Sequence, residues 1–322
     1  KPGEVVMEVK NLSSIHEKSF QDVSFTLRKG EILGFGGLVG AQRTELLEGV
    51  FGMRAIKSGE IYIKGKKVNI KHPADAMKAG IGLITEDRRG NGIFGCLSIK
   101  DNVGVSIYNK HLKAGFVLDH KTINGIVDDS IKKLRIKTPN MQEHIANLSG
   151  GNQQKVIVAR WLANDPDVLI MDEPTAGLDV EARNEILDML RAYIAEDESR
   201  SILITSHIST DLESLCDELY LIHDGKLILH EATDAILEQY GILKVDEEQY
   251  RTLDKTAVIR AQKETYGYAC FTNDRRFYQE KKLTRQQLME LVETARLTPS
   301  AANRQPFKYR IVCDEEENEK VF

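Results

Sequence analysis

The residues with the clearest chemical potential form one glycine-containing segment, Gly37-Leu38-Val39-Gly40-Ala41-Gln42-Arg43-Thr44. An apolar segment predicted to be a strand (residues 32–35) precedes it, and a predicted helix (45–50) follows it. This context is typical of a phosphate-binding loop, G-x-x-x-x-G-K-S/T, in which backbone N–H groups and a helix N-terminus hold phosphate. Taken alone, the loop fits a plain glycine-rich turn equally well.

Two positions of this loop depart from the phosphate-binding pattern. Arg43 replaces the lysine with a bulkier planar cation, and Gln42 replaces the second glycine, adding a side chain where backbone would approach a ligand closely. Thr44 keeps the hydroxyl expected to bind Mg²⁺. The sequence therefore predicts a degenerate phosphate loop.

Further polar residues follow segments predicted to be buried strands or to begin helices. Asp172-Glu173 follows the apolar run 168–171, as expected of a central parallel strand, and His207 follows the predicted strand 201–206. Ser149 is placed to cap a helix running to about residue 162.

The elements that must position these residues alternate between strands and helices. Hairpins are predicted around Gly65 and around Asp224-Gly225, and a polar, mostly helical region extends from about 88 to 147. This order predicts a mainly parallel α/β core with an antiparallel layer.

Composition excludes several classes of protein. The chain has 322 residues, a net charge of −5 and 41% apolar residues, which indicates one large or two ordinary globular domains. No apolar stretch reaches the roughly 18 residues of a membrane helix, and the acidic balance gives no footprint for nucleic acid. Four dispersed cysteines argue against a disulfide framework or a zinc site. The first residues, Lys1-Pro2-Gly3-Glu4, suggest a piece of something longer.

The motifs together, in this order, resemble those of the ATP-binding-cassette (ABC) ATPases over roughly residues 4 to 240. The resemblance is carried by the phosphate loop, Leu148-Ser149-Gly150-Gly151-Asn152-Gln153-Gln154, Asp172-Glu173-Pro174-Thr175, Leu178-Asp179 and His207. It implies an α/β P-loop NTPase fold with a RecA-like core, an antiparallel β layer and a helical subdomain. Beyond it we expect an α+β appendage at the C-terminus. The implied cassette domain spans 1–243, with the helical subdomain at about 88–165.

The same resemblance implies a role for each motif residue, with ATP and Mg²⁺ as cofactors. Glu173 would orient and deprotonate the attacking water, and His207 would sense the γ-phosphate. The implied metal-binding residues are Thr44, Asp172 and Glu86. The implied nucleotide-binding residues are Gly37, Gly40, Ala41, Gln42, Arg43, Thr44, Glu86, Ser149, Gly150, Gly151 and Asp179. Ser149, Gly150 and Gly151 would cap a nucleotide bound by a second cassette, so one chain alone would build no complete site.

Residues 4–174 are similar to the second cassette of the sugar-importer ATPases of ribose, galactose or xylose uptake. Lys29-Gly30-Glu31, Arg43-Thr44-Glu45 and Thr85-Glu86-Asp87-Arg88-Arg89 carry this likeness. It implies an ATP-hydrolysing subunit of carbohydrate import at the cytoplasmic face of a bacterial plasma membrane. Because Gln42 and Arg43 depart from the loop pattern, we expect ATP hydrolysis by this chain alone to be weak. Its partners would be a second cassette and transmembrane permease subunits, without a membrane span or nucleic-acid contact of its own. The sequence does not identify the transported sugar.

The remainder of the chain resembles other families, so the whole chain looks like a mosaic of three sources. Residues 175–280 resemble single-cassette ATPases of exporter type, so an exporter is an alternative function, and 244–281 are expected to form a charged, irregular extension. Residues 282–322 resemble the N-terminal segment of the nitroreductase flavoproteins, carried by Leu297-Thr298-Pro299-Ser300-Ala301-Ala302-Asn303-Arg304-Gln305-Pro306.

Two functions outside transport compete with this interpretation: a flavin-dependent reductase, and a soluble cassette protein that acts on ribosomes or DNA. The reductase would need a flavin pocket. A segment of about 40 residues is too short to enclose one, so we expect it to bind no FMN. Cassette proteins that act on ribosomes or DNA generally carry two cassettes or a long coiled-coil insertion, and neither is present in this sequence.

Overall fold

The computed structural model describes residues 3–280 and divides into two compact units, Lys1–Thr233 and Asp234–Phe322. The predicted end of the cassette at residue 243 differs from this division, because residues 241–243 belong to a strand of the second unit. The segment predicted to resemble nitroreductases, 282–322, lies outside the described residues. Within the described part, no helix is both long enough and apolar enough to cross a membrane.

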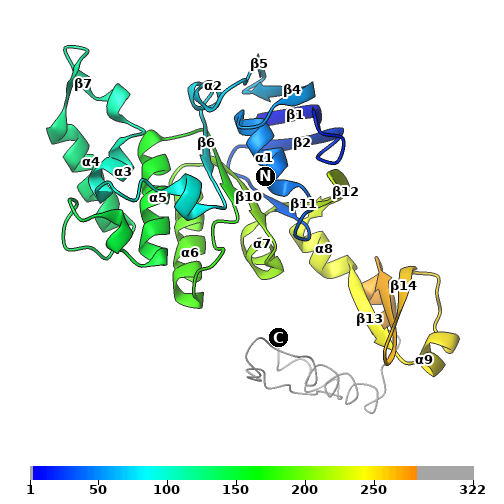
Figure 1. Ribbon diagram of the computed structural model, residues 1–322. Coiled ribbons are helices and arrows are strands. Elements are labelled where there is room, and N and C mark those ends of the chain that lie inside the picture. The colour runs from blue at the N-terminus through cyan, green and yellow to red at the C-terminus, as the bar shows by residue number, and fades with distance from the viewer. Residues whose placement is uncertain (1–2, 281–322) are drawn as a thin grey trace. The chain divides into compact units, whose positions relative to one another are not determined.

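A six-stranded sheet forms the centre of the first unit (Figure 1). Five of its strands are parallel, and the sixth pairs antiparallel at one edge. The order across the sheet is β12 (Lys226–Ala232), β11 (Glu218–His223), β3 (Ile32–Gly36), β10 (Ser201–Ser206), β9 (Val168–Asp172) and β6 (Ile81–Ile84). β3, β9 and β10 are buried along their whole length, which explains the apolar runs that they contain.

The register of this sheet brings the predicted site residues to one edge. Ser206 pairs with Gly36 and Thr205 pairs with Asp172, so the loops that follow β3, β9 and β10 leave the sheet side by side. Ligands of open α/β sheets bind outside the carboxyl ends of the strands. The strand pattern therefore sets the position of the site.

The predicted antiparallel layer is a four-stranded sheet. Its order is β2 (Val23–Arg28), β1 (Val5–Ser14), β4 (Ile56–Ile63) and β5 (Lys66–Val68). The two sheets share one hydrophobic core. Phe25 of the antiparallel sheet packs edge-on against Phe35 of β3, with ring centroids 5.1 Å apart. The fold class predicted from the sequence is confirmed.

The helices of the first unit fall into two groups. Around the sheets are α1 (Arg43–Phe51), α2 (Pro73–Lys78), α6 (Val180–Glu196) and α7 (Ser209–Leu215). Figure 1 shows the second group gathered together, formed by α3 (Ile99–Gly104), α4 (His120–Lys133), α5 (Gly150–Asn164) and a small hairpin of β7 (Leu112–Lys113) and β8 (Val117–Leu118). Arg160 of α5 connects this group to the segment before it, because it donates to the carbonyls of Asn102 in α3 and of Gly92.

The segment after residue 240 is regular, which corrects the expectation of an irregular extension. β13 (Gly241–Val245), β15 (Gly267–Thr272) and β14 (Val258–Glu264) form an antiparallel sheet in that order. The helices α9 (Glu247–Thr252) and α10 (Arg275–Glu280) accompany it, and α8 (Thr233–Gln239) precedes it. Tyr250 of α9 stacks on Tyr268 of β15 with centroids 3.8 Å apart. Tyrosine packing thus stabilises a sheet whose short strands gave no clear periodic signal.

Candidate functional site

The loop after β3 turns sharply into α1. Gly37 is required there, because a Cβ at this position would lie 2.7 Å from the Ile222 carbonyl oxygen. Gly40 and Gln42 both have left-handed backbone, with φ of 83° and 76°. Gln42 donates from Nε2 to the Gly40 carbonyl (3.2 Å). The first N–H groups of α1 have no intrahelical acceptors, so the end of this loop has the donors that an anion needs.

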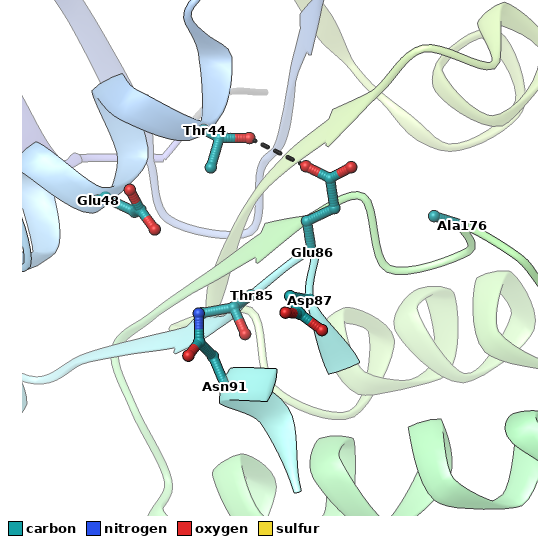
Figure 2. A pocket seen from close by; sticks show the side chains of 7 residues that line it. All are labelled: Thr44, Glu48, Thr85, Glu86, Asp87, Asn91 and Ala176. Atoms are coloured by element: carbon teal, nitrogen blue, oxygen red, sulfur yellow. Dashed lines mark hydrogen bonds between the residues drawn. The ribbon is translucent and has the colours of Figure 1, made fainter. Parts of the chain in front are cut away.

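Thr44, in the first turn of α1, borders a pocket of about 320 Å³ (Figure 2). Its Oγ1 donates to Oε2 of Glu86, which follows β6, over 3.4 Å. The pocket is lined by Thr44, Glu48, Thr85, Glu86, Asp87, Asn91 and Ala176. Thr44 and Glu86 are distant in sequence but adjacent here, as the sequence resemblance implies.

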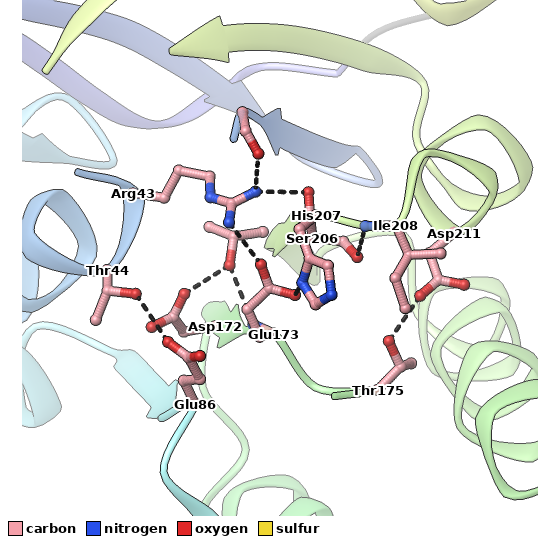
Figure 3. Close-up of polar contacts among 12 residues, drawn as sticks. Arg43, Thr44, Glu86, Asp172, Glu173, Thr175, Ser206, His207, Ile208 and Asp211 are labelled. Carbon is pink, nitrogen blue, oxygen red and sulfur yellow. Dashed lines mark hydrogen bonds and ion pairs between the residues drawn. The ribbon is translucent and has the colours of Figure 1, made fainter. Parts of the chain in front are cut away.

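Arg43 contacts protein groups through both nitrogens at the end of its guanidinium (Figure 3). One of them, Nη1, donates to the carbonyls of Gly37 (2.6 Å) and Ser206 (2.8 Å). The other, Nη2, lies 2.8 Å from Glu173 Oε1. The Arg43 side chain is only 8% exposed. Its guanidinium therefore connects the ends of β3, β9 and β10.

Asp172 and Glu173 end β9 and are held from the neighbouring strand by one hydroxyl. Thr205 Oγ1 donates to Asp172 Oδ1 (2.6 Å) and accepts from the Glu173 N–H (3.0 Å). The pKa of Asp172 is raised to about 6, mainly by burial and also by the nearby carboxylates of Glu86 and Glu173, while hydrogen bonds from Thr205 and Thr44 oppose the shift. A buried, negatively charged carboxylate in this position is ready to accept a cation.

Glu173 bridges Arg43 and His207. Its Oε2 lies 2.8 Å from Nδ1 of His207, which donates when that nitrogen carries the proton. Glu173 has a left-handed backbone with φ of 47°, a conformation that costs a non-glycine residue about 1–2 kcal/mol. Such strain persists only where the surroundings hold it, and it concentrates at functional sites.

The candidate metal-binding residues fit Mg²⁺ by their chemistry. Thr44, Glu86 and Asp172 offer one hydroxyl and two carboxylates, and Mg²⁺ prefers such oxygen ligands, usually with several waters and substrate phosphates. Among the described residues, no group of three His, Cys, Asp or Glu side chains could hold a metal by itself. Any Mg²⁺ here would thus depend on water and phosphate for most of its ligands.

The remaining predicted residues do not join this cluster. Ser149 occupies the N-cap position of α5 without the predicted side-chain cap bond; its Oγ instead accepts from Asn152 Nδ2 (2.9 Å). Gly150 and Gly151 allow close approach, since added Cβ atoms would lie 3.0 Å from Arg88 and 2.7 Å from Ala182. Asp179 caps α6 by accepting from the Ala182 N–H (2.8 Å).

Two supporting residues were missed from the sequence. Thr205 holds the acidic pair, and Asp211, wholly buried in α7, accepts from Thr175 (2.6 Å) two residues beyond Glu173. Asp211 lies four residues after His207, in a helix too short to show a pattern. The strand before His207 offered one hint, because the polar residues Thr205 and Ser206 directly follow its apolar run 202–204.

Comparison with known proteins identifies the first unit. The model of the ABC transporter family matches residues 20–176. The chain contains an ABC transporter ATP-binding domain. The galactose/methyl galactoside import ATP-binding protein of Clostridium tetani is 50% identical over 226 residues, which are 70% of this chain and 44% of that protein. The ribose import ATP-binding protein of Oceanobacillus iheyensis is 41% identical over 243 residues, covering 74% and 48%. The chain thus spans about half the length of these relatives.

Solved structures share the fold of the ATP-binding domain. The cbiO1 protein of Clostridium perfringens, described as part of an ABC transporter complex, superposes with a TM-score of 0.62 at 23% identity, covering 73% of this chain and 91% of that one. A dimeric ATP-binding cassette in a post-hydrolysis state with ADP and Pi gives a TM-score of 0.61 at 19% identity, covering 70% and 98%. These likenesses confirm the predicted P-loop NTPase architecture.

A second family model, that of the nitroreductases, matches residues 273–322. It begins before the predicted start at 282 and mostly covers residues outside the described part. Two unrelated families therefore match one chain, which supports its interpretation as a mosaic.

Proposed function

We propose that this chain binds Mg-ATP at the cluster around Arg43, Thr44 and Asp172 and serves as an ATP-binding subunit in carbohydrate import. The observation that supports this most is the convergence of Thr44, Glu86, Asp172, Glu173 and His207 from four separate segments onto one edge of the sheet. The named relatives are import ATP-binding proteins for galactose and ribose.

Each part of the cluster has a chemical task in this proposal. The N–H groups that begin α1 hold phosphate, and Thr44, Asp172 and Glu86 hold Mg²⁺ with its waters. Glu173 orients a water molecule and takes its proton, and His207 keeps the Glu173 carboxylate in place through Nδ1. Mg²⁺ bound there would neutralise charge that develops on the phosphate oxygens.

The start of α5 has a different task in the proposal. Within the described residues, the Ser149 hydroxyl contacts Asn152 of its own helix rather than the cluster, which fits a surface that serves another cassette's nucleotide. The partners would be a second cassette, joined head to tail, and permease subunits at the cytoplasmic face of a bacterial membrane. We expect hydrolysis by this chain alone to be weak, because Arg43 already engages Glu173.

Equilibrium binding of fluorescent ATP to the full chain, with Mg²⁺ and with EDTA, tests the proposal. Thr44→Val should remove most of the Mg²⁺-dependent part of the affinity, because it deletes the hydroxyl ligand. Thr122→Val is the matched control, since its hydroxyl contacts Asp119 at the start of α4. The proposal fails if the wild-type chain shows no Mg²⁺-dependent binding, or if both variants lose affinity equally.

A further inference from the structure

A buried carboxylate that the proposed chemistry does not use lies behind the cluster. Asp211, in the first turn of α7, has no exposed surface. Its Oδ2 accepts from Thr175 Oγ1 (2.6 Å), and its Oδ1 pairs with Nε of Arg183 in α6. Arg183 also donates from Nη2 to Thr210 Oγ1 (2.6 Å). One carboxylate thus connects three segments of the chain.

Each of these three segments carries a residue of the candidate site. Thr175 lies two residues after Glu173, Arg183 lies in the first turn of the helix that Asp179 caps, and Asp211 lies four residues after His207. Figure 3 shows Thr175 and Asp211 joined on the side of Glu173 and His207 away from Thr44.

The backbone of Glu173 needs such support. Its left-handed conformation (φ 47°) is unfavourable for a residue with a side chain, so local contacts must hold it. Thr205 holds it on one side, because its Oγ1 accepts a hydrogen bond from the Glu173 N–H. On the other side its carbonyl accepts from the Ala176 N–H (3.0 Å), in a turn whose Thr175 is fixed by Asp211.

We propose that Asp211 is a positioning residue of this site: by holding Thr175 and Arg183, it keeps Glu173 in contact with His207 and fixes the start of α6. This rests on the proposed function of Glu173 and His207. Without Asp211, the turn after Glu173 loses its anchor and the backbone of Glu173 relaxes toward negative φ. The carboxylate then moves away from the imidazole.

Histidine NMR on the full chain, labelled with ¹³C at the imidazole ε1 carbons, tests the positioning without nucleotide. His207→Gln assigns the His207 resonance, and Glu173→Gln shows how far it moves when the contacting carboxylate is removed. Asp211→Asn should move the resonance through most of that displacement. Thr175→Val, which deletes only one hydroxyl, should move it in the same direction and serves where Asp211→Asn does not fold.

Glu185→Gln is the matched control for loss of an ion pair on the same helix. Glu185 pairs with the buried Lys155 of α5 (2.9 Å). We expect that Glu185→Gln leaves the His207 resonance in place. The proposal is overturned if Glu173→Gln moves the resonance while Asp211→Asn and Thr175→Val do not. It is also overturned if Glu173→Gln leaves the resonance unmoved, since the contact would then be absent.

ATP turnover supplies the second measurement. Misplacing a reacting group by about 1 Å can cost about 100-fold, so Asp211→Asn should lower kcat by up to about 100-fold with little change in the nucleotide Kd. A fall in kcat no larger than that of Glu185→Gln counts against positioning. If the wild-type chain hydrolyses no ATP, the hydrolytic part of the proposed function fails, and the NMR result still decides the role of Asp211.

Discussion

Nη2 of Arg43 lies 2.8 Å from Oε1 of Glu173, and the two side chains are only 8% and 3% exposed. Arg43, which was expected to bind phosphate, thus pairs with Glu173, the carboxylate proposed to activate water. Two charges so far from solvent are tolerated because each has its partner, and because Arg43 also donates to two carbonyls. Nucleotide entering this loop has to compete with these contacts.

Removing the cation should destabilise the first unit strongly. Arg43→Met leaves Glu173 buried without its counter-charge, which typically costs about 3–5 kcal/mol in the free energy of unfolding. Arg43→Met combined with Glu173→Gln should be less destabilised, because no unpaired charge remains. Guanidinium unfolding of the three proteins checks this, and equal losses for the single and double variants would show that the pair contributes only by packing.

Restoring glycine at position 42 should stabilise the chain and tighten nucleotide binding. Gln42 has a φ of 76°, so Gln42→Gly relieves an unfavourable backbone conformation and yields up to about 1 kcal/mol after the entropy cost of glycine. Titration of fluorescent ATP and thermal unfolding measure the two effects.

The control for position 42 is Gln142→Gly, because Gln142 is exposed and its backbone does not have a positive φ. It should leave binding unchanged and should not stabilise the chain. The idea fails if Gln42→Gly lowers stability. The double variant Gln42→Gly plus Arg43→Lys tests the two loop departures together. If it binds ATP no more tightly than wild type, neither departure limits the affinity.

The sequence predicted the central sheet and the convergence of its loops because each strand has a continuous apolar run followed by polar residues. β9 with Asp172-Glu173 and β10 with His207 are examples. It could not predict the partners of Arg43, because the Ser206 carbonyl carries no side-chain signal. Asp211 was missed for a similar reason: its partner Thr175 lies 36 residues away, and only the fold brings them together.

The sheet after residue 240 escaped prediction for another physical reason. Its strands alternate, but the outward positions of β13 include the apolar Ile242, 66% exposed, beside Lys244. An apolar residue on the exposed face hides the period of two on which strand prediction depends. The tyrosine stacking on the other face joins Tyr250 of α9 to Tyr268 of β15, two residues that only the fold brings together.

The raised pKa of Asp172 predicts a pH-dependent effect of Asp172→Asn. The folded-state pKa of about 6 exceeds the unfolded value of 3.8, so folding favours the protonated carboxyl and wild-type stability falls as pH rises from about 4 to about 6. The asparagine variant has no such cost. At pH 7 its free energy of unfolding should therefore exceed that of wild type by up to about 3 kcal/mol, and near pH 4 the two values should match.

Denaturant unfolding at pH 4, 5, 6 and 7 measures this difference. Asp188→Asn, which changes an exposed carboxylate of α6, is the control and should show no comparable trend. A stability difference between Asp172→Asn and wild type that stays constant across this pH range would contradict the prediction. Mg²⁺ with ATP should reduce the advantage of the variant, because only the wild-type carboxylate gains a cation.

The start of α5 should matter to a second cassette and little to this chain's own stability. Ser149 makes no side-chain cap bond to the helix, so Ser149→Ala should cost less than the roughly 1 kcal/mol typical of a true cap. Asp179→Ala, which removes the cap bond to Ala182, should show that full cost and serves as the comparison.

Mixing the chain with a competent first cassette of a sugar importer should raise the ATPase rate, and Ser149→Arg should abolish the gain by placing a large cation where the partner's nucleotide would dock. An unchanged rate on mixing, with both proteins folded, would contradict a shared site; a normal gain with Ser149→Arg would place the contact elsewhere on the domain.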